Sequence, residues 1–342
     1  MKAKLHDSFN FLSKITLRRI WNVVRVISSF YYSKITKKVL VKGNPFTISI
    51  EPTTACNLAC PECPSGQKIF SRPTGKMDPE FFRKTIDAIH KDLIYLIFYF
   101  QGEPYLNPKF LEMVSYAAKK KIYTITSTNA HFIDDKTAKA TIESGLDRLI
   151  ISLDGTTQEV YQNYRVNGSM EKVLAGAEHL VKWKKKLKSK TPHLIFQFLV
   201  VRPNEHQIED VKALAKKIGV DEVKFKSAQI YDYKNGSDLI PLNEKYSRYK
   251  KSADGTYEIK NELNNYCWKM WHSNVVTWDG KVVPCCFDKD AKYVMGDMTE
   301  KPFHEIWESG EYGKFRQNLA THRNQIDICK NCTEGGKVWL LG

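Results

Sequence analysis

The sequence predicts an α/β fold with a mainly parallel sheet, preceded by an amphipathic N-terminal helix and followed by a small C-terminal α+β domain. From Phe46 onward, short apolar segments alternate with amphipathic segments of helical period, which is the pattern of strand–helix–strand units. The cysteines form two groups with none between Cys63 and Cys267, which indicates two separate sites. A chain of 342 residues is long enough for two compact domains.

Residues 1–45 predict a basic amphipathic segment. Its apolar residues recur at helical spacing: Leu17, Ile20, Trp21, Val24, Ile27 and Tyr31. Residues 1–50 hold ten Lys or Arg and one acid, Asp7, so they carry +9 of the chain's net +15. A basic helix with an apolar face fits an anionic membrane surface, and we expect peripheral membrane contact through residues 8–42. The alternatives are a helix packed on the protein's own core with a solvated basic face and, less favoured, RNA contact.

The predicted strands occupy residues 46–50, 93–100, 122–127, 148–153, 194–201 and 222–226. Asp78-Pro79 and Asn107-Pro108 each predict a helix start, with a capping side chain before a proline at the first helical position. We expect residues 46–226 to form the first domain. The polar residues 227–266 predict a linker and part of a substrate cover, and residues 267–342 the second domain.

Cys56, Cys60 and Cys63 follow the first predicted strand as Cys-x3-Cys-x2-Cys. Three thiolates at this spacing can hold an iron–sulfur cluster, and a four-iron cluster with three protein ligands leaves one iron open to a substrate or cofactor. A structural zinc site needs four ligands, and no further Cys or His lies near enough in sequence to complete the set. Disulfides are disfavoured by the odd number and by the absence of a secretory signal.

The second cysteine group comprises Cys267, Cys285, Cys329 and Cys332, which on spacing alone fit zinc or a fully ligated 4Fe–4S cluster equally well. Cys286 is left over, and we expect it to be a buried free thiol. Asp279-Gly280 predicts the turn of a hairpin before Cys285, and residues 303–319 predict one helix before Cys329.

With the Cys-x3-Cys-x2-Cys triplet, the chain resembles the radical S-adenosylmethionine (radical SAM) family over most of residues 46–342. The resemblance implies a partial (βα)6 barrel, a catalytic 4Fe–4S cluster on the triplet, and SAM bound at the open iron and reductively cleaved to a 5′-deoxyadenosyl radical. The second cysteine group resembles the family's twitch domain, a short form of the SPASM extension. It implies an auxiliary 4Fe–4S cluster on four cysteines, and the chemistry implies a low-potential electron donor such as flavodoxin or ferredoxin.

Further motifs resemble the family's SAM-binding segments. Gln101-Gly102-Glu103-Pro104 is similar to Gly-Gly-Glu-Pro, which implies that Glu103 accepts hydrogen bonds from the SAM amino group. Arg165 matches an arginine that pairs with the SAM carboxylate. The alternatives are a helix-start acid for Glu103 and a surface salt bridge for Arg165. The resemblance implies that Ser127–Asn129 contacts the nucleoside and that Ser152–Asp154 reaches the ribose and the cluster. The implied cofactor-binding residues are Gly102, Glu103, Ser127, Asn129, Ser152, Asp154 and Arg165.

One position departs from the family pattern. Glu62 stands where many members have an aromatic residue beside the adenine, so adenine contact is expected from backbone groups and from Val200 and Val201. No proton donor or base can be assigned. His131, Gln197, Lys224 and Lys226 lie near expected strand ends without a pattern that singles one out.

A second cluster suggests oxidation, because a substrate radical must lose a further electron to become a ketone. Twitch-type relatives include aminocyclitol dehydrogenases, so we expect dehydrogenation or epimerisation of a polar, sugar-like substrate. One alternative is a peptide maturase, although residues 1–45 are too short for a winged-helix peptide-recognition domain. The other is a non-catalytic metal-binding adaptor held at the membrane. We expect a cytoplasmic protein at the inner face of the membrane, a small-molecule or peptide substrate, and no nucleic-acid partner.

Overall fold

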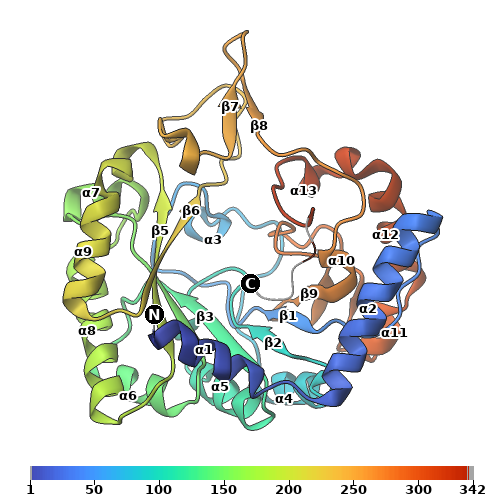
Figure 1. Ribbon diagram of the computed structural model, residues 1–342, viewed down its shortest axis with the longest axis horizontal. Helices are drawn as coiled ribbons and strands as arrows, with labels where there is room; N and C mark the ends of the chain where they lie inside the picture. The colour runs from blue at the N-terminus through green and yellow to red at the C-terminus, as the bar shows by residue number, and fades with distance from the viewer. Residues whose placement is uncertain (1, 337, 339–342) are drawn as a thin grey trace.

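The computed structural model describes residues 2–336 and 338, and its largest sheet there has nine strands (Figure 1). The strand order is β11-β10-β9-β1-β2-β3-β4-β5-β6. The central six run parallel in chain order: β1 (Thr47–Ile50), β2 (Tyr95–Ile97), β3 (Tyr123–Thr128), β4 (Arg148–Ser152), β5 (His193–Val200) and β6 (Glu222–Ser227). The predicted α/β fold with a partial (βα)6 barrel is confirmed.

Helices follow the strands (Figure 1). They are α3 (Pro64–Gln67), α4 (Pro79–Ile89), α5 (Phe110–Lys119), α6 (Asp135–Glu143), α7 (Gln158–Tyr164), α8 (Met170–Lys186) and α9 (Ile208–Ile218), with short 3-10 turns η1 (Pro104–Leu106) and η2 (Arg202–Gln207). Of these, α4 to α9 cover the outer face of the barrel, whereas the short α3 lies at the cysteine-bearing end of β1 (Figure 1). Asp78 caps α4 as predicted, because its carboxylate accepts from the amides of Glu80 and Phe81. Asn107 Oδ1 accepts from the Lys109 amide at 2.9 Å, as expected of a capping side chain, but α5 begins only at Phe110, and Asn107 Nδ2 donates to the carbonyls of Pro52 and Met77.

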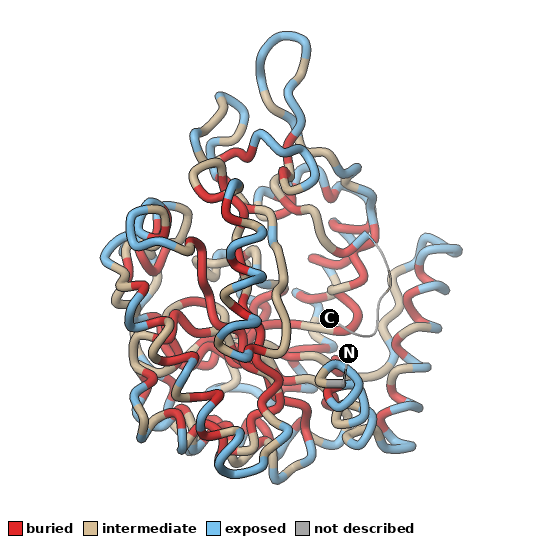
Figure 2. The backbone as a smooth tube through the Cα atoms, turned by 60° about the vertical axis from the view of Figure 1, so that its left-hand side comes forward, coloured by how far each residue is buried: buried red, intermediate tan, exposed pale blue. Residues whose placement is uncertain are grey.

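Side chains alternate between the two faces of the barrel sheet. Ile125, Ile150 and Ile195 form a cluster in the barrel interior with Tyr95, Ile97 and Tyr99. The intervening strand residues pack beneath the surrounding helices in one extended core. Figure 2 shows buried residues in the interior and alternating buried and exposed residues along the outer helices.

Two N-terminal helices, α1 (Lys2–Leu12) and α2 (Leu17–Thr36), lie across one face of the barrel (Figure 1). The α2 helix packs on the barrel and, through Phe30, on Trp268 and Trp271, and the face that it buries mixes polar and apolar side chains. Its buried residues are Arg19, Asn22, Val26, Ser29, Phe30 and Ser33, whereas the predicted apolar face is exposed apart from the half-buried Ile27. The Arg19 guanidinium donates to the carbonyls of Lys14, His90 and Lys121, so hydrogen bonds add to the apolar contacts of Val26 and Phe30. No helix in the described residues is both long enough and apolar enough to span a bilayer.

The C-terminal strands β9 (Ser273–Val276), β10 (Lys281–Val283) and β11 (Gly296–Asp297) extend the barrel sheet beside β1. The predicted hairpin at Asp279-Gly280 is confirmed, and Gly280 takes a φ of 91° in its turn. The single helix predicted for 303–319 is wrong, because Ser309 caps a new helix through the Tyr312 amide. The helices of this region are α10 (Lys269–His272), α11 (Phe303–Trp307), α12 (Gly310–His322) and α13 (Asp327–Lys330), with η4 (Arg323–Gln325). Residues 337 and 339–342 of the expected second domain lie outside the described residues.

Residues 227–266 contain the turn η3 (Glu244–Tyr246) and a hairpin of β7 (Tyr249–Lys251) and β8 (Tyr257–Ile259), which projects at the top of Figure 1. The base of this hairpin is attached to the C-terminal region. Tyr249 Oη donates to Asn331 Oδ1 at 3.0 Å, and Asn331 Nδ2 donates to the Ile230 carbonyl at 2.7 Å.

A buried ion pair links β1 to the segment before α4. Arg72 Nη1 and Nη2 donate to the two carboxylate oxygens of Glu51 at 2.8 and 2.5 Å, and both side chains are almost fully buried. Replacing Arg72 by Ala leaves this carboxylate unpaired, so we expect the free energy of unfolding of the metal-free protein to fall by about 3 kcal/mol. Urea unfolding measures this loss. The control Arg83→Ala, at an exposed pair with Glu112, should cost less than about 1 kcal/mol, and equal losses would contradict the account.

Candidate active site at the cysteine loop

The three predicted cluster ligands lie on the loop between β1 and α3, at the carboxyl end of the first barrel strand. We name residues 51–63 the cysteine loop. Its backbone is fixed on both sides: the Glu103 amide donates to the Ala55 carbonyl at 2.7 Å, and the Ala59 amide donates to the Val166 carbonyl at 3.0 Å. Hydrogen bonds from two other segments therefore hold the loop in place.

Gly102 allows the turn after β2 to touch the cysteine loop. Its φ is +75°, and a Cβ atom there would lie 2.2 Å from the Thr53 carbonyl oxygen and 2.8 Å from that of Ala55. Only glycine fits this conformation and this space without a shift of the backbone. The close backbone approach that was expected at Gly102 is a contact with the cysteine loop of the same chain.

Glu103 lies fully inside this region, between the ends of β2 and β3. Its carboxylate accepts from Thr128 Oγ1 at 2.8 Å, from the Asn129 amide at 2.7 Å and from the Tyr105 amide at 3.3 Å. Burial raises the pKa of Glu103 to about 7, against the lowering effect of these hydrogen bonds. It caps the short turn η1, as the alternative interpretation expected, and it also holds the end of β3.

Asn129 brings the end of β3 to the cluster ligands. Its Nδ2 donates to Asn57 Oδ1 at 2.8 Å and lies 4.0 Å from the Cys56 sulfur. The Glu103 carboxylate also accepts from the backbone amide of Asn129. Glu103 after β2 and Asn129 after β3 are therefore held together beside Cys56.

Asp154 and Arg165 form a buried pair beside the second cysteine. Arg165 Nε donates to Asp154 Oδ2 at 2.5 Å, and the Leu199 amide donates to Asp154 Oδ1 at 2.7 Å. Arg165 Nη1 lies 3.8 Å from the Cys60 sulfur. Burial opposes the charge of Arg165, but Asp154 and Cys60 outweigh it and keep its pKa well above the usual value. The alternative of a surface salt bridge is wrong, since the Asp154 side chain is fully buried.

Ser127 and Ser152 continue the interior faces of β3 and β4, two residues beyond Ile125 and Ile150 of the interior cluster. Ser152 pairs in register with Gln197 of β5. The carboxyl ends of these strands thus bring the predicted cofactor residues to the rim of the barrel near the cysteine loop, although their contacts with SAM stay predictions.

Apolar side chains surround the cysteine loop. Val201 packs in a cluster with Leu58, Cys60 and Tyr164, and Cys56 and Cys63 lie against the same cluster. Glu62, which replaces the usual aromatic residue, accepts from the Tyr231 amide at 2.9 Å and so connects this loop to residues 227–266.

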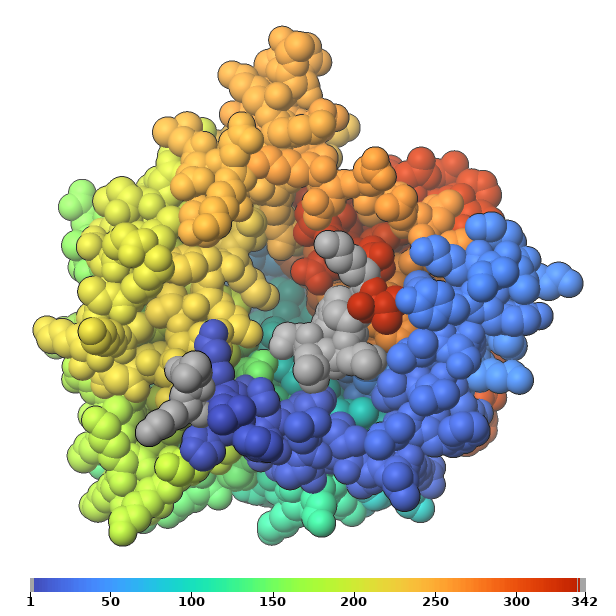
Figure 3. Space-filling model, in the orientation of Figure 1, coloured from blue at the N-terminus to red at the C-terminus, as the bar shows by residue number. Residues whose placement is uncertain are grey.

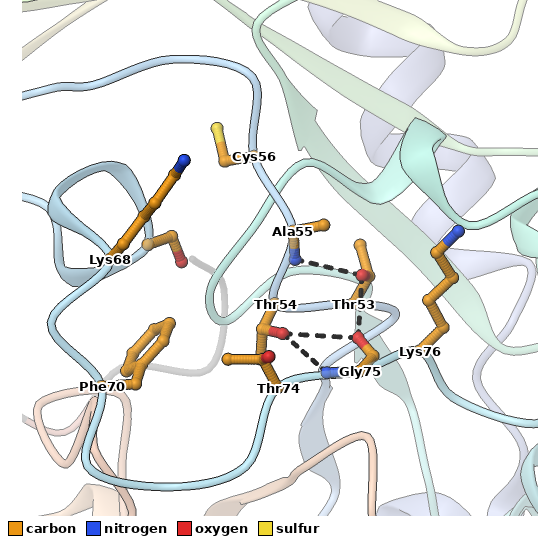
Figure 4. Close-up of a pocket in the computed structure, with 10 residues that line it drawn as sticks. Thr53, Thr54, Ala55, Cys56, Lys68, Phe70, Thr74, Gly75 and Lys76 are labelled. Atoms are coloured by element: carbon orange, nitrogen blue, oxygen red, sulfur yellow. Dashed lines mark hydrogen bonds between the residues drawn. The ribbon is translucent and has the colours of Figure 1, made fainter.

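A cavity of 470 Å³ opens beside Cys56, and Figure 4 shows the Cys56 sulfur and the Lys68 amine directed into the same space. The hydroxyl of Thr53 donates to the Gly75 carbonyl, which fixes one wall of this cavity. Its lining consists of Thr53, Thr54, Ala55, Cys56, Ser65, Lys68, Phe70, Thr74, Gly75 and Lys76.

A second cavity, of 320 Å³, occupies the barrel interior and reaches the second cysteine group. We call it the barrel cavity. Gln197, Lys224 and Lys226 line it, whereas His131 does not: the His131 ring accepts from the Ser169 amide at 2.8 Å and bonds to Asn129, which is a structural role. Arg148 and Lys269 also line this cavity and were missed, although Arg148 begins a predicted strand with the interior parity of Ile150.

Cys286 is exposed, so the expected buried thiol is wrong. It lines the barrel cavity together with Cys285, and Lys269 Nζ lies 3.8 Å from its sulfur. Cys286 follows the end of β10, where the chain has left the sheet, and this frees its side chain from the core.

Three cysteines of the second group, Cys267, Cys329 and Cys332, lie beside Arg323. Cys267, Cys329 and Cys332 are buried, and Arg323 Nη2 lies 3.7 Å from the Cys332 sulfur. Burial raises the pKa of Cys329 to about 12, whereas the Arg323 guanidinium lowers it. A cationic side chain beside several thiols suits the anionic thiolates that iron requires.

The donor sets fit iron–sulfur clusters. Each position offers cysteines with an adjacent guanidinium, Arg165 at the triplet and Arg323 at the second group. Within the described residues, no three Cys, His, Asp or Glu side chains converge as the ligands of one metal ion do. Ligands that each bind a different iron of a cluster need not converge in this way.

The sequence comparisons agree with this geometry. Residues 50–218 match the radical SAM superfamily, and residues 267–333 match SPASM, an iron–sulfur cluster-binding domain. The chain is a radical SAM enzyme with a SPASM domain. These two domains imply SAM and two 4Fe–4S clusters as its cofactors.

Curated relatives of this radical SAM enzyme differ in what they act on. The chain is 27% identical to the tungsten-containing aldehyde ferredoxin oxidoreductase cofactor-modifying protein of Pyrococcus furiosus, over 83% of this chain and 86% of the relative. It is 24% identical to the S-adenosyl-L-methionine-dependent 2-deoxy-scyllo-inosamine dehydrogenase of Niallia circulans, over 83% and 91%. A crystal structure of Streptococcus suis SuiB bound to S-adenosylmethionine has a TM-score of 0.63 at 14% identity, over 90% of this chain and 74% of SuiB.

The contact at Gly102 yields a first test of the site. Replacing Gly102 by Ala forces the cysteine loop away from the turn after β2, so we expect reductive SAM cleavage to fall at least tenfold. The rate of 5′-deoxyadenosine formation by the reconstituted enzyme without oxygen measures this. Gly255→Ala is the matched control, because Gly255 also has positive φ but nothing lies within 4 Å of its Cβ position. Full activity of Gly102→Ala would show that the contact is dispensable.

The buried pair yields a second test. Replacing Asp154 by Asn removes the charge that orients Arg165, so SAM affinity should fall about tenfold, equivalent to one charge-assisted hydrogen bond. Equilibrium dialysis of labelled SAM against the reconstituted enzyme measures this affinity. Asp135→Asn, at an exposed pair with Lys182, should leave SAM affinity unchanged. Wild-type affinity in Asp154→Asn would remove Arg165 from the predicted SAM contacts.

Proposed function

We propose that this enzyme removes a hydrogen atom from a polar carbon of a small, sugar-like substrate and completes a dehydrogenation or epimerisation. The observation that carries the proposal is the barrel cavity, which joins the barrel interior to Cys285 of the second cysteine group. A substrate held there lies between the predicted SAM-binding rim and the auxiliary site. This arrangement suits a reaction that takes a hydrogen atom on one side and an electron on the other.

When bound, SAM and the clusters supply the radical that takes the hydrogen atom and an acceptor for the electron. The chain itself supplies positioning: Glu103 and Asn129 fix the rim near Cys56, and the pair of Asp154 and Arg165 fixes the rim near Cys60. The apolar cluster around the cysteine loop excludes water from this region.

The lining of the barrel cavity favours a small polar substrate. Its 320 Å³ lies at the low end of the range for small-molecule sites. Isoleucines form part of the wall, while Gln197, Lys224 and Lys226 project amide and amine donors from β5 and β6. Donors of this kind can bind the hydroxyl and oxyanion groups of a sugar-like molecule.

Lys224 is the candidate proton acceptor. Burial lowers its pKa, as do the nearby charges of Arg148 and Lys226. When a carbon bearing a hydroxyl becomes a ketone after hydrogen-atom and electron loss, the hydroxyl proton must leave, and a neutral Lys224 Nζ can accept it. Reduction of SAM requires an electron donor, and the net charge of +15 suits an acidic carrier such as flavodoxin or ferredoxin.

A peptide substrate is the second candidate. An open cavity of 710 Å³ lies beside the cysteine loop, with Ile69 and Phe70 on one side and Tyr231 and Tyr233 on another. One solved structure of SuiB holds its precursor peptide SuiA, so a fold of this kind accommodates peptides. The third interpretation, a non-catalytic adaptor, is disfavoured because Glu103, Asn129 and Arg165 converge on the cysteine loop.

Deuterium transfer separates the two substrate classes. We expect deuterium from a ring-labelled aminocyclitol or sugar to appear in 5′-deoxyadenosine, as detected by mass spectrometry of the reconstituted enzyme. Transfer from labelled peptides alone would overturn the small-molecule proposal and favour the open cavity.

The role of Lys224 predicts a pH effect. The neutral amine is the active form, so the turnover rate should rise with pH through the lowered pKa of Lys224 in the wild type. Lys224→Gln should lose this rise and slow product formation about hundredfold, within the usual range for a general base, while SAM cleavage persists. Lys217→Gln, at an exposed lysine of α9, serves as the control. An unchanged pH profile in Lys224→Gln would assign the proton to another group.

A further inference from the structure

The α2 helix exposes an apolar stripe. A helix that packs on a protein normally turns its apolar side chains inward, yet α2 buries Arg19, Asn22, Ser29 and Ser33 together with Val26 and Phe30, and a second apolar stripe faces outward. The stripe follows the i, i+3/i+4 spacing of one helix face. It consists of Leu17, Ile20, Trp21, Val24, Tyr31 and Ile35, with Leu17 85% and Ile35 78% exposed.

Apart from Arg19 Nε, the buried polar side chains of α2 are hydrogen-bonded, so the outward stripe is not a packing defect. Asn22 Nδ2 donates to the Asn44 carbonyl at 2.9 Å, and the Asn44 amide donates back to Asn22 Oδ1 at 2.8 Å. Ser33 Oγ donates to the Leu40 carbonyl at 2.9 Å and accepts from the Leu40 amide at 2.8 Å. These bonds, with those of Arg19, fix the rotation of α2 and hold the apolar stripe outward.

The α1 helix repeats the arrangement. Its buried Asp7 bonds to Tyr123 and Arg148 at the barrel, and Asn10 Nδ2 donates to Asp147 Oδ1 at 2.7 Å. Leu5, Phe9 and Leu12, at i, i+4 and i+7, are exposed on the other side. Ten of the sixteen exposed large apolar residues among the described ones belong to α1 and α2.

Both helices lie on the same face of the molecule, where they border its central hollow (Figure 3). Basic residues accompany the stripes. Lys4, Lys14 and Arg18 are paired with barrel acids, whereas Arg25, Lys34, Lys38 and Lys42 are exposed and take part in no salt bridge among the described residues. The one acid of this segment, Asp7, is buried and already paired.

We propose that α1 and α2 form a docking surface that binds the protein to an anionic lipid bilayer. An apolar stripe flanked by basic side chains matches the interface of such a bilayer, with the apolar groups at the acyl boundary and the cations at the headgroups. A second copy of this chain is a poorer occupant, because a symmetric contact would bring the two basic borders together. The surface is independent of the radical SAM chemistry.

Vesicle sedimentation with the full-length reconstituted enzyme tests the docking surface. We expect binding to vesicles of phosphatidylcholine and phosphatidylglycerol, and much weaker binding to phosphatidylcholine alone. Arg25→Gln/Lys34→Gln/Lys38→Gln should weaken binding to the anionic vesicles about hundredfold, at roughly fivefold per charge. The matched control Lys185→Gln/Lys188→Gln/Lys190→Gln removes three exposed lysines at and after the end of α8 and should bind as the wild type.

The apolar stripe is tested separately. Leu17→Ser/Trp21→Ser/Ile35→Ser should weaken vesicle binding at least tenfold, whereas Leu187→Ser/Leu242→Ser/Val294→Ser, at exposed apolar positions elsewhere, should not. Brominated lipids should quench the fluorescence of the wild type and not of Trp21→Phe, because Trp21 is the one exposed tryptophan in the described chain. This second readout needs no destabilising substitution.

Two results would overturn the proposal. One is equal vesicle binding by wild type and stripe variant. The other is a wild type that ignores vesicles but dimerises in solution while the stripe variant is monomeric, which would make this surface an interface between copies. SAM cleavage without vesicles, measured in every variant, should stay unchanged, so failure of the docking surface is distinguishable from failure of the proposed function.

Discussion

The contact between the turn after β2 and the cysteine loop is the constraint on which the site depends. At Gly102 the two backbones lie so close that a Cβ atom would overlap the Thr53 carbonyl oxygen. The next residue, Glu103, donates its amide to Ala55 and directs its carboxylate toward the end of β3. One backbone contact therefore sets the position of the cluster ligands and of the strand ends that face them.

Buried charge is the second organising feature. Glu103, Asp154 and Arg165 lie in a region of low exposure, where each charged group needs partners to be stable. The partners come from β3, β5 and the cysteine loop, so the cost of burying the charges is offset by hydrogen bonds that also fix the geometry. In the same way, Arg19 of α2 bonds to the carbonyls at the ends of the helices beneath it, and an apolar stripe of α2 stays free for an external surface.

The barrel could be predicted from sequence because its strands are apolar, regularly spaced and followed by capped helices. The cysteine loop and the Glu103 segment could be placed because they immediately follow strands, and parallel strands end at one edge of the sheet.

The orientation of α2 could not be predicted, since periodicity shows which residues share a face but not whether that face is turned inward. The capping oxygen of Asn107 could be predicted, but the bonds of its Nδ2 to the carbonyls of Pro52 and Met77, which are distant in sequence, could not. Lys269 of the barrel cavity could not be predicted either, because the pairing of β9 with β1, which brings its segment beside the barrel, joins strands far apart in sequence.

The most direct test of two iron–sulfur sites is the iron, sulfide and zinc content per chain after oxygen-free reconstitution, in the wild type and in Cys56→Ala/Cys60→Ala/Cys63→Ala. The account predicts about eight irons in the wild type and about four in the variant, one cluster at each cysteine group. About four irons falling to none, with one zinc retained in both proteins, would contradict it. The second cysteine group would then be structural, and no electron acceptor would lie beside the barrel cavity.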